Sequence, residues 1–197
     1  MNFGILFILG IVFGIQLLMP KTRINKSGFF GILSFAIAII FIFGFAGYQS
    51  WQQYFLWKNS ELGKFFLPPY QKLDYFVFYS RTHFFNSYFL SLLISLLFLS
   101  SAKYYNQKHG EKFFEPIELY LLAISIFLAG HPAWLFYLII LLTVFLIINF
   151  LLSTFYFLLN KEMPRISLYY LWLPVAISTI LINGWLSRLP WWQTLKF

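Results

Sequence analysis

The sequence predicts an all-α membrane protein, a single-domain bundle of five or six transmembrane helices. Sixty per cent of its 197 residues are hydrophobic and 10% are charged, whereas soluble proteins are about 25% charged. Its 27 Phe and 13 Tyr exceed what a water-facing surface could hide. No Asp, Glu, Lys or Arg lies between Glu118 and Lys161. Within that run, an unbroken helix over 134–159 would reach about 39 Å, more than a hydrocarbon core of roughly 30 Å.

The first expected span is 3–19, which ends before Pro20. Basic residues follow this apolar stretch, whereas a signal peptide carries them in front of it and ends in small residues at a cleavage site. We therefore expect the segment to be retained as a helix. It contains Gly10 and Gly14 at a GxxxG spacing, which allows close helix contact, and we expect this pair to pack within the bundle.

The second expected span is 28–48, and an aromatic-rich segment without a span follows it over 49–80. Pro68-Pro69 in this segment blocks a continuous helix. Its first part carries residues typical of a headgroup boundary, namely Trp51, Phe55, Trp57 and Lys58. Two interpretations stay open: a functional loop, as long loops often are, or an interfacial elbow.

The third and fourth expected spans are 83–102 and 116–129. Ser91 and Ser95 in the third lie one turn apart and predict a small-residue packing face. The fourth is short for a full crossing, so a half-buried or re-entrant helix is an alternative. Gly130-His131-Pro132 then forms a turn before the long fifth span, 134–159.

The sixth expected span is 166–187, and the tail that follows predicts an aromatic belt at the interface. Trp191 and Trp192 lie there between Arg188 and Lys196. With six crossings and the N-terminus outside, eight Lys and Arg lie in cytoplasmic loops and six lie outside, which favours that orientation.

The formal net charge of +8 is spread between the apolar runs, which indicates topology and contact with anionic headgroups rather than nucleic-acid binding. The expected partners are the lipid bilayer and other membrane protein subunits. We expect the protein in a bacterial inner (cytoplasmic) membrane, with an organelle membrane as the alternative.

Several kinds of catalytic or metal site are excluded or disfavoured. The chain has no Cys, so disulfides, thiol nucleophiles and thiolate metal sites are impossible. No two His share a metal-ligand spacing, and neither a GxSxG motif nor a phosphate loop is present. We expect no metal and no cofactor.

The candidate catalytic residues are carboxylates. Glu115 and Glu118 are three residues apart, so they share a helical face and could divide acid and base roles. The alternative is structural, because Pro116 at the first helical position would place Glu118 where a carboxylate caps free N–H groups. Asp74 is the only Asp in the chain.

A lipid-headgroup site is the other candidate. Arg81 and His83 stand just before the third span, where they could hold a phosphate-bearing headgroup. Anchoring at the interface is the simpler interpretation of the same two residues.

The segment 84–183 resembles the second half of the prepilin peptidases, which are membrane aspartic proteases. The shared order is Glu-Leu-Tyr-Leu-Leu-Ala from Glu118, then Gly130-His-Pro-Ala, then Arg165-Ile-Ser-Leu-Tyr. Where that family has Gly-x-Gly-Asp, this chain has Glu115-Pro116-Ile117-Glu118. The resemblance therefore implies that Glu118 replaces a catalytic Asp, with Asp74 as the only counterpart of the other, in a relative with altered or lost catalysis.

Three functions follow from these observations. The leading hypothesis is a non-catalytic scaffold or subunit of a membrane assembly, because no complete catalytic set is present. The alternative is a prepilin-peptidase-like aspartic or glutamic protease. A transporter of lipids or small solutes is the third, and it would use polar residues inside spans: Thr143, Asn149, Ser178, Thr179 and Asn183.

Overall fold

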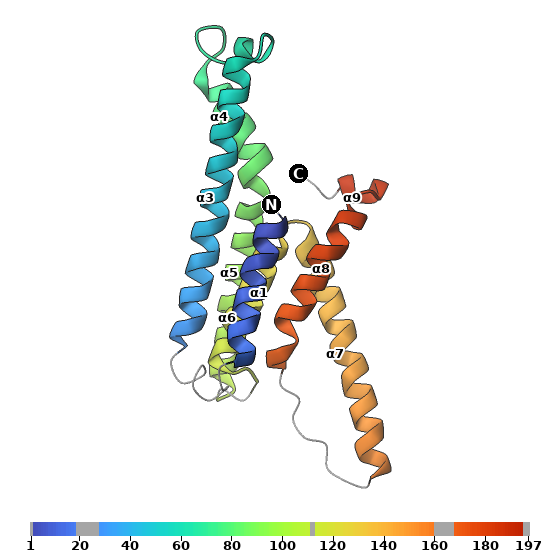
Figure 1. Ribbon diagram of the computed structural model, residues 1–197. Helices are drawn as coiled ribbons and strands as arrows, with labels where there is room; N and C mark the ends of the chain where they lie inside the picture. Colours follow the sequence, from blue (N-terminus) through green and yellow to red (C-terminus); the bar gives the residue numbers. More distant parts are fainter. Residues whose placement is uncertain (1, 19–27, 111–112, 160–167, 195–197) are drawn as a thin grey trace.

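The computed structural model describes residues 2–18, 28–110, 113–159 and 168–194, and these residues form helices and connecting turns without a strand (Figure 1). The all-α prediction is confirmed. The helices are α1 (Asn2–Leu18), α3 (Phe29–Asn59), α4 (Leu73–Ser80), α5 (Asn86–Lys108), α6 (Pro116–Ala129), α7 (Ala133–Leu158), α8 (Trp172–Leu186) and α9 (Pro190–Thr194). Three single turns complete the set: η1 (Gly63–Phe66), η2 (Arg81–Phe85) and η3 (Leu168–Tyr170).

Four helical segments of the described chain are long and apolar enough to cross a membrane. They are Phe29–Asn59, Leu73–Lys108, Ala133–Leu158 and Leu168–Leu186. The two other apolar helices, Gly4–Leu18 and Pro116–Ala129, are shorter. The start of α1 and the end of α8 lie at the same end of the bundle, which is also the end where α6 turns into α7 (Figure 1). The number of spans, five or six, stays a prediction.

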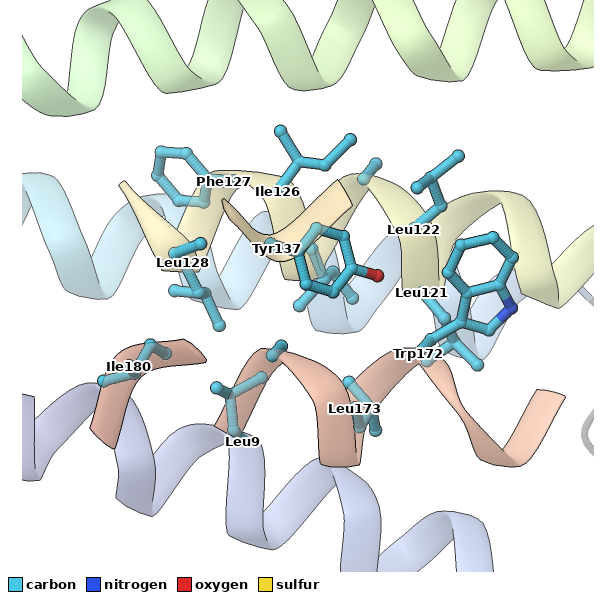
Figure 2. Packing of buried hydrophobic residues seen from close by; sticks show 14 of the residues in the cluster. Leu9, Leu121, Leu122, Ile126, Phe127, Leu128, Tyr137, Trp172, Leu173 and Ile180 are labelled. Atoms are coloured by element: carbon cyan, nitrogen blue, oxygen red, sulfur yellow. The ribbon is translucent and has the colours of Figure 1, made fainter. Parts of the chain in front are cut away.

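Helix α6 forms the centre of the molecule. Every residue from Ile117 to Ala129 is buried except Tyr120. Its neighbours are α3, α5, α7 and α8, so protein rather than lipid surrounds it (Figure 1). Figure 2 shows side chains of α1 and α8, including Leu9 and Leu173, in the layer beside it. The helix that looked too short to cross the membrane is therefore the core.

Small residues allow the neighbours to approach α6 closely. Ser91 and Ser95 on α5 are fully buried, and α5 packs along α6, which confirms the predicted packing face. On α3, a Cβ added at Gly31 would lie 2.7 Å from the Cβ of Tyr120. These contacts fix the distance between the backbones of the helices.

The glycine pair of α1 behaves differently. A Cβ added at Gly10 or Gly14 would have nothing within 4 Å, and Gly10 is exposed. The expectation that this pair packs within the bundle is therefore wrong for the described residues. Helix α1 instead packs with larger side chains, because Ile5, Leu9 and Val12 carry its buried stripe.

Helix α3 continues well past the expected end of its span at residue 48. It reaches Asn59, so much of the segment predicted as a loop is helical. The polar residues there are satisfied locally: the Ser50 hydroxyl donates to the carbonyl of Ala46 at 2.9 Å, and the Gln52 amide donates to the Tyr48 hydroxyl at 2.7 Å. The helix stops at Asn59, and Pro68-Pro69 lies in the connection before α4 begins.

Helices α3 and α4–η2–α5 form a hairpin that extends beyond the rest of the bundle (Figure 1). We call residues 51–80 the hairpin head. Trp57 is its centre, with ring centroids 4.7 Å from Tyr79, 5.5 Å from Phe66 and 5.6 Å from Phe76. These aromatic contacts hold the two arms of the hairpin together beyond the other described helices (Figure 1).

Helix α7 is the least covered of the long helices. Its buried residues are Ala133, Tyr137 and Leu141, all in its first half. Figure 1 shows its second half diverging from the bundle. This helix matches the predicted span 134–159 within one residue at each end.

Candidate functional site

The carboxylates of α6 form a helix cap. The Glu118 Oε2 atom accepts the Glu115 N–H at 3.1 Å, and the Glu115 side chain in turn accepts the Glu118 N–H, while Pro116 occupies the first turn. This is a reciprocal capping box, which satisfies N–H groups that the helix itself cannot bond. Only 3% of Glu118 is exposed. The capping alternative is confirmed for this pair.

The structure does not bring Asp74 to this pair. Asp74 lies in the first turn of α4, in the hairpin head. Helix α6 begins at the opposite end of the molecule from α4 (Figure 1). The two carboxylates that the prepilin-peptidase resemblance would require, Glu118 and Asp74, are therefore on different ends of the bundle.

Arg81 and His83 lie on different sides of η2. This segment is a single turn of π-helix, in which residues two apart point in nearly opposite directions. Arg81 lines an apolar cavity of about 280 Å³ with Phe85 and Phe89, whereas His83 lines a separate polar cavity. The two side chains do not converge on one headgroup phosphate.

The polar cavity lies where five parts of the chain meet and has a volume of about 190 Å³. Its polar lining comes from α3, η2, α5, the α6–α7 turn and α8: Gln49, His83, Ser87, His131 and Asn183. The wall is completed by Phe84, Ala129 and Gly130 and by Tyr88, which carries a phenolic hydroxyl. Of these residues, the sequence singled out only His83, Asn183 and the Gly130-His131 turn.

The imidazole of His83 is held by its own helix. Its Nδ1 lies 3.0 Å from the carbonyl oxygen of Tyr79, and the two rings stack with centroids 4.0 Å apart. A carbonyl only accepts, so Nδ1 carries a proton, and in the neutral ring Nε2 is the acceptor. His83 thus brings a hydrogen-bond acceptor to the cavity.

His131 is oriented by two contacts. The Trp134 indole donates to its Nδ1 at 3.2 Å, and because indole only donates, the proton of the neutral ring is on Nε2. The Ser87 hydroxyl donates to the His131 carbonyl at 2.7 Å and ties α5 to the α6–α7 turn. The turn itself uses Gly130 at a φ of 74°, a backbone conformation that glycine adopts without strain. The wall of the cavity is therefore built by specific bonds.

The tail residues behave in two ways. Trp192 in α9 is fully buried and packs on Phe136 of α7, with ring centroids 5.1 Å apart. The sequence predicts an interface residue there, but the structure uses it to attach α9 to the bundle. The side chain of Trp191 lies outside the described part of the structure.

Most of the mid-span polar residues are bonded to their own helices. Thr143, Asn149, Ser178 and Thr179 each donate to the carbonyl four residues earlier, at 2.8–3.0 Å. Of the five proposed for transport, Asn183 is the one that lines the polar cavity. Among the described residues, no three His, Asp or Glu side chains come together as a metal site.

Compared with known protein families, curated proteins and solved structures, the chain matches none of them. Its class rests on its own architecture, a helical bundle with four segments long and apolar enough to span a bilayer. That architecture is compatible with a multi-pass integral membrane protein.

Proposed function

We propose that the chain is a non-catalytic subunit of a membrane assembly and that the hairpin head binds its protein partner. The observation that carries this proposal is exposed apolar surface on the hairpin head, which the length of α3 places beyond the bilayer. Helix α3 rises about 30 Å between Phe29 and Gln49, the thickness of the hydrocarbon core. About 15 Å of α3 remain between Gln49 and Asn59, and a headgroup layer on one side adds only roughly 5–8 Å. With the hydrocarbon core beginning at Phe29, the outer part of the head would stand in water.

Large apolar side chains cover this outer part. The exposed fraction is 64% for Leu56 and 68% for Phe78. Soluble surfaces rarely carry apolar patches of more than a few hundred Å², and larger ones mark interaction sites. A protein partner with an apolar face would remove this area from water. The aromatic contacts around Trp57 preorganise the head, so less conformational entropy is lost when a partner binds.

The acidic residues support the non-catalytic part of the proposal. Glu115 and Glu118 are engaged with backbone N–H groups of their own helix. A protease of the prepilin-peptidase type would have to use Glu118 while the cap held it, together with Glu115 from the same cap or with Asp74 in α4. The protease alternative remains open to direct test through Glu118→Gln.

Site-specific photocrosslinking in native membranes tests the partner. Benzoylphenylalanine is placed at Leu56 or Phe78 in the head, and at Ile40 or Phe150, which are each 72% exposed within spans. We expect one and the same protein to be attached at both head positions, with only lipid adducts at the two control positions. Leu56→Glu should release that protein without lowering the unfolding temperature. Lipid adducts alone at both head positions would contradict the proposal.

A further inference from the structure

We propose that the polar cavity binds the uncharged, hydroxyl-rich headgroup of a membrane lipid. This goes beyond the proposed partner binding and does not depend on it. The cavity's volume of about 190 Å³ would hold about six waters at roughly 30 Å³ each. It is therefore large enough for a glycerol or a single sugar ring and smaller than the usual pocket for a drug-sized ligand.

The position of the cavity points to a lipid. Gln49 on its wall lies about 30 Å along α3 from Phe29. This distance equals the thickness of a hydrocarbon core, so with Phe29 at one edge of the core the cavity lies at the depth where headgroups begin. The apolar cavity with Phe85 and Phe89 lies on the other side of the same π-turn. Single π-turns within helices are frequent at functional sites.

The lining selects an uncharged group. Its polar groups are two amides, the hydroxyls of Ser87 and Tyr88, and two imidazoles, and it includes neither a carboxylate nor a Lys or Arg. A phosphate would lack a cationic partner there, and Arg81 lines the other cavity. A cation would lack a carboxylate there. Amides and imidazoles of both donor and acceptor type match hydroxyl groups, which both donate and accept.

We expect His83 and Asn183 to recognise the headgroup through hydrogen bonds. Nδ1 of His83 is engaged by the Tyr79 carbonyl, which presents Nε2 as an acceptor for a hydroxyl. Asn183 supplies an amide with both a donor and an acceptor from the opposite helix, α8. Ser87 and His131 hold the wall in place through their mutual bond.

The chain contains a matched control for His83 and another for Asn183. His109 repeats the arrangement of His83, since its Nδ1 lies 2.9 Å from the Tyr105 carbonyl and its ring packs on Tyr105 with centroids 4.3 Å apart. It lies at the other end of α5 and does not line the cavity. Asn149 on α7 is a partly buried amide that bonds to its own helix and likewise does not line the cavity.

The experiment uses the full-length protein in phosphatidylcholine nanodiscs that contain a small fraction of monoglucosyl diacylglycerol. Native mass spectrometry measures retention of the glucolipid relative to phosphatidylcholine. We expect at least a tenfold preference, lost in His83→Phe and in Asn183→Leu and kept in His109→Phe and in Asn149→Leu. Unfolding temperatures verify that all four variants are folded. If methyl glucoside competes, the cavity recognises the sugar itself; if only the glucolipid binds, it recognises the lipid-linked form.

Two results would overturn the proposal. One is equal retention of glucolipid and phosphatidylcholine by the wild-type protein. The other is a preference that His83→Phe and Asn183→Leu leave unchanged or that the two control variants remove equally. A failure of this experiment leaves the hairpin-head proposal intact, because the crosslinking positions do not line the cavity.

Discussion

Helices α6 and α7 follow one another in the chain and share an apolar composition, but they have opposite surroundings. Helix α6 has 14 residues, of which 12 are buried. Helix α7 has 26 residues, of which three are buried. In water, apolar composition indicates the core. In a bilayer it does not, because lipid accepts the same side chains, so length and close packing distinguish the two helices.

The largest expected effect comes from removing the same side chain on each helix. Phe127 on α6 is fully buried and meets the ring of Phe35 edge-on, with centroids 6.1 Å apart. Phe127→Ala should lower the free energy of unfolding by about 3–5 kcal/mol, because it leaves a cavity. Phe150→Ala on α7, where 72% of the side chain is exposed, should change it by less than about 0.5 kcal/mol. Denaturation in mixed micelles measures both, and equal losses would contradict the assignment of core and surface.

A smaller effect is expected from the close contact between α3 and α6. Gly31→Ala would place a methyl group 2.7 Å from the Cβ of Tyr120, so a helix must shift. We expect a loss of about 1–3 kcal/mol. Gly44→Ala on the same helix has nothing within 4 Å of the added carbon and should be neutral or slightly stabilising, because alanine favours helix. A neutral Gly31→Ala would show that α6 is not packed this tightly.

The smallest effect is expected at the start of α6. Glu118→Ala removes the acceptor for the Glu115 N–H and should cost about 0.5–2 kcal/mol. Glu118→Gln keeps an oxygen that can accept the same bond and should cost less. Thermal unfolding of the wild-type protein, Glu118→Gln and Glu118→Ala checks whether their stabilities fall in that order. Assembly in the membrane should survive Glu118→Gln, whereas loss of a proteolytic activity in that variant would favour the protease alternative.

The sequence predicted α6 and α7 well because their ends carry strong local signals. Pro116 with Glu118 begins α6, and Gly130 ends it. The end of α3 was not predicted, since Gln49, Ser50 and Gln52 suggest a loop by composition. Bonds along the helix satisfy two of them, Ser50 and Gln52.

The polar cavity could not be predicted because its residues come from separate helices. Gln49, Ser87 and Asn183 are common residues in unremarkable local contexts, and only the packing of α3, α5 and α8 brings them together. The available signal was their shared depth, since each lies close to the end of an expected span. The same limit applies to Gly10 and Gly14. A GxxxG spacing allows close helix contact but does not predict whether another helix packs against it.

The lengths of the helices give the protein a different hydrophobic thickness on each side. Helix α1 is about 26 Å long, whereas α7 is about 39 Å. If both helices cross the membrane, a bilayer of roughly 30 Å would thin beside α1, and beside α7 either the bilayer would thicken or the helix would tilt. The protein would therefore impose a step in bilayer thickness across its own diameter, and neighbouring membrane proteins would be sorted by which side matches their own spans.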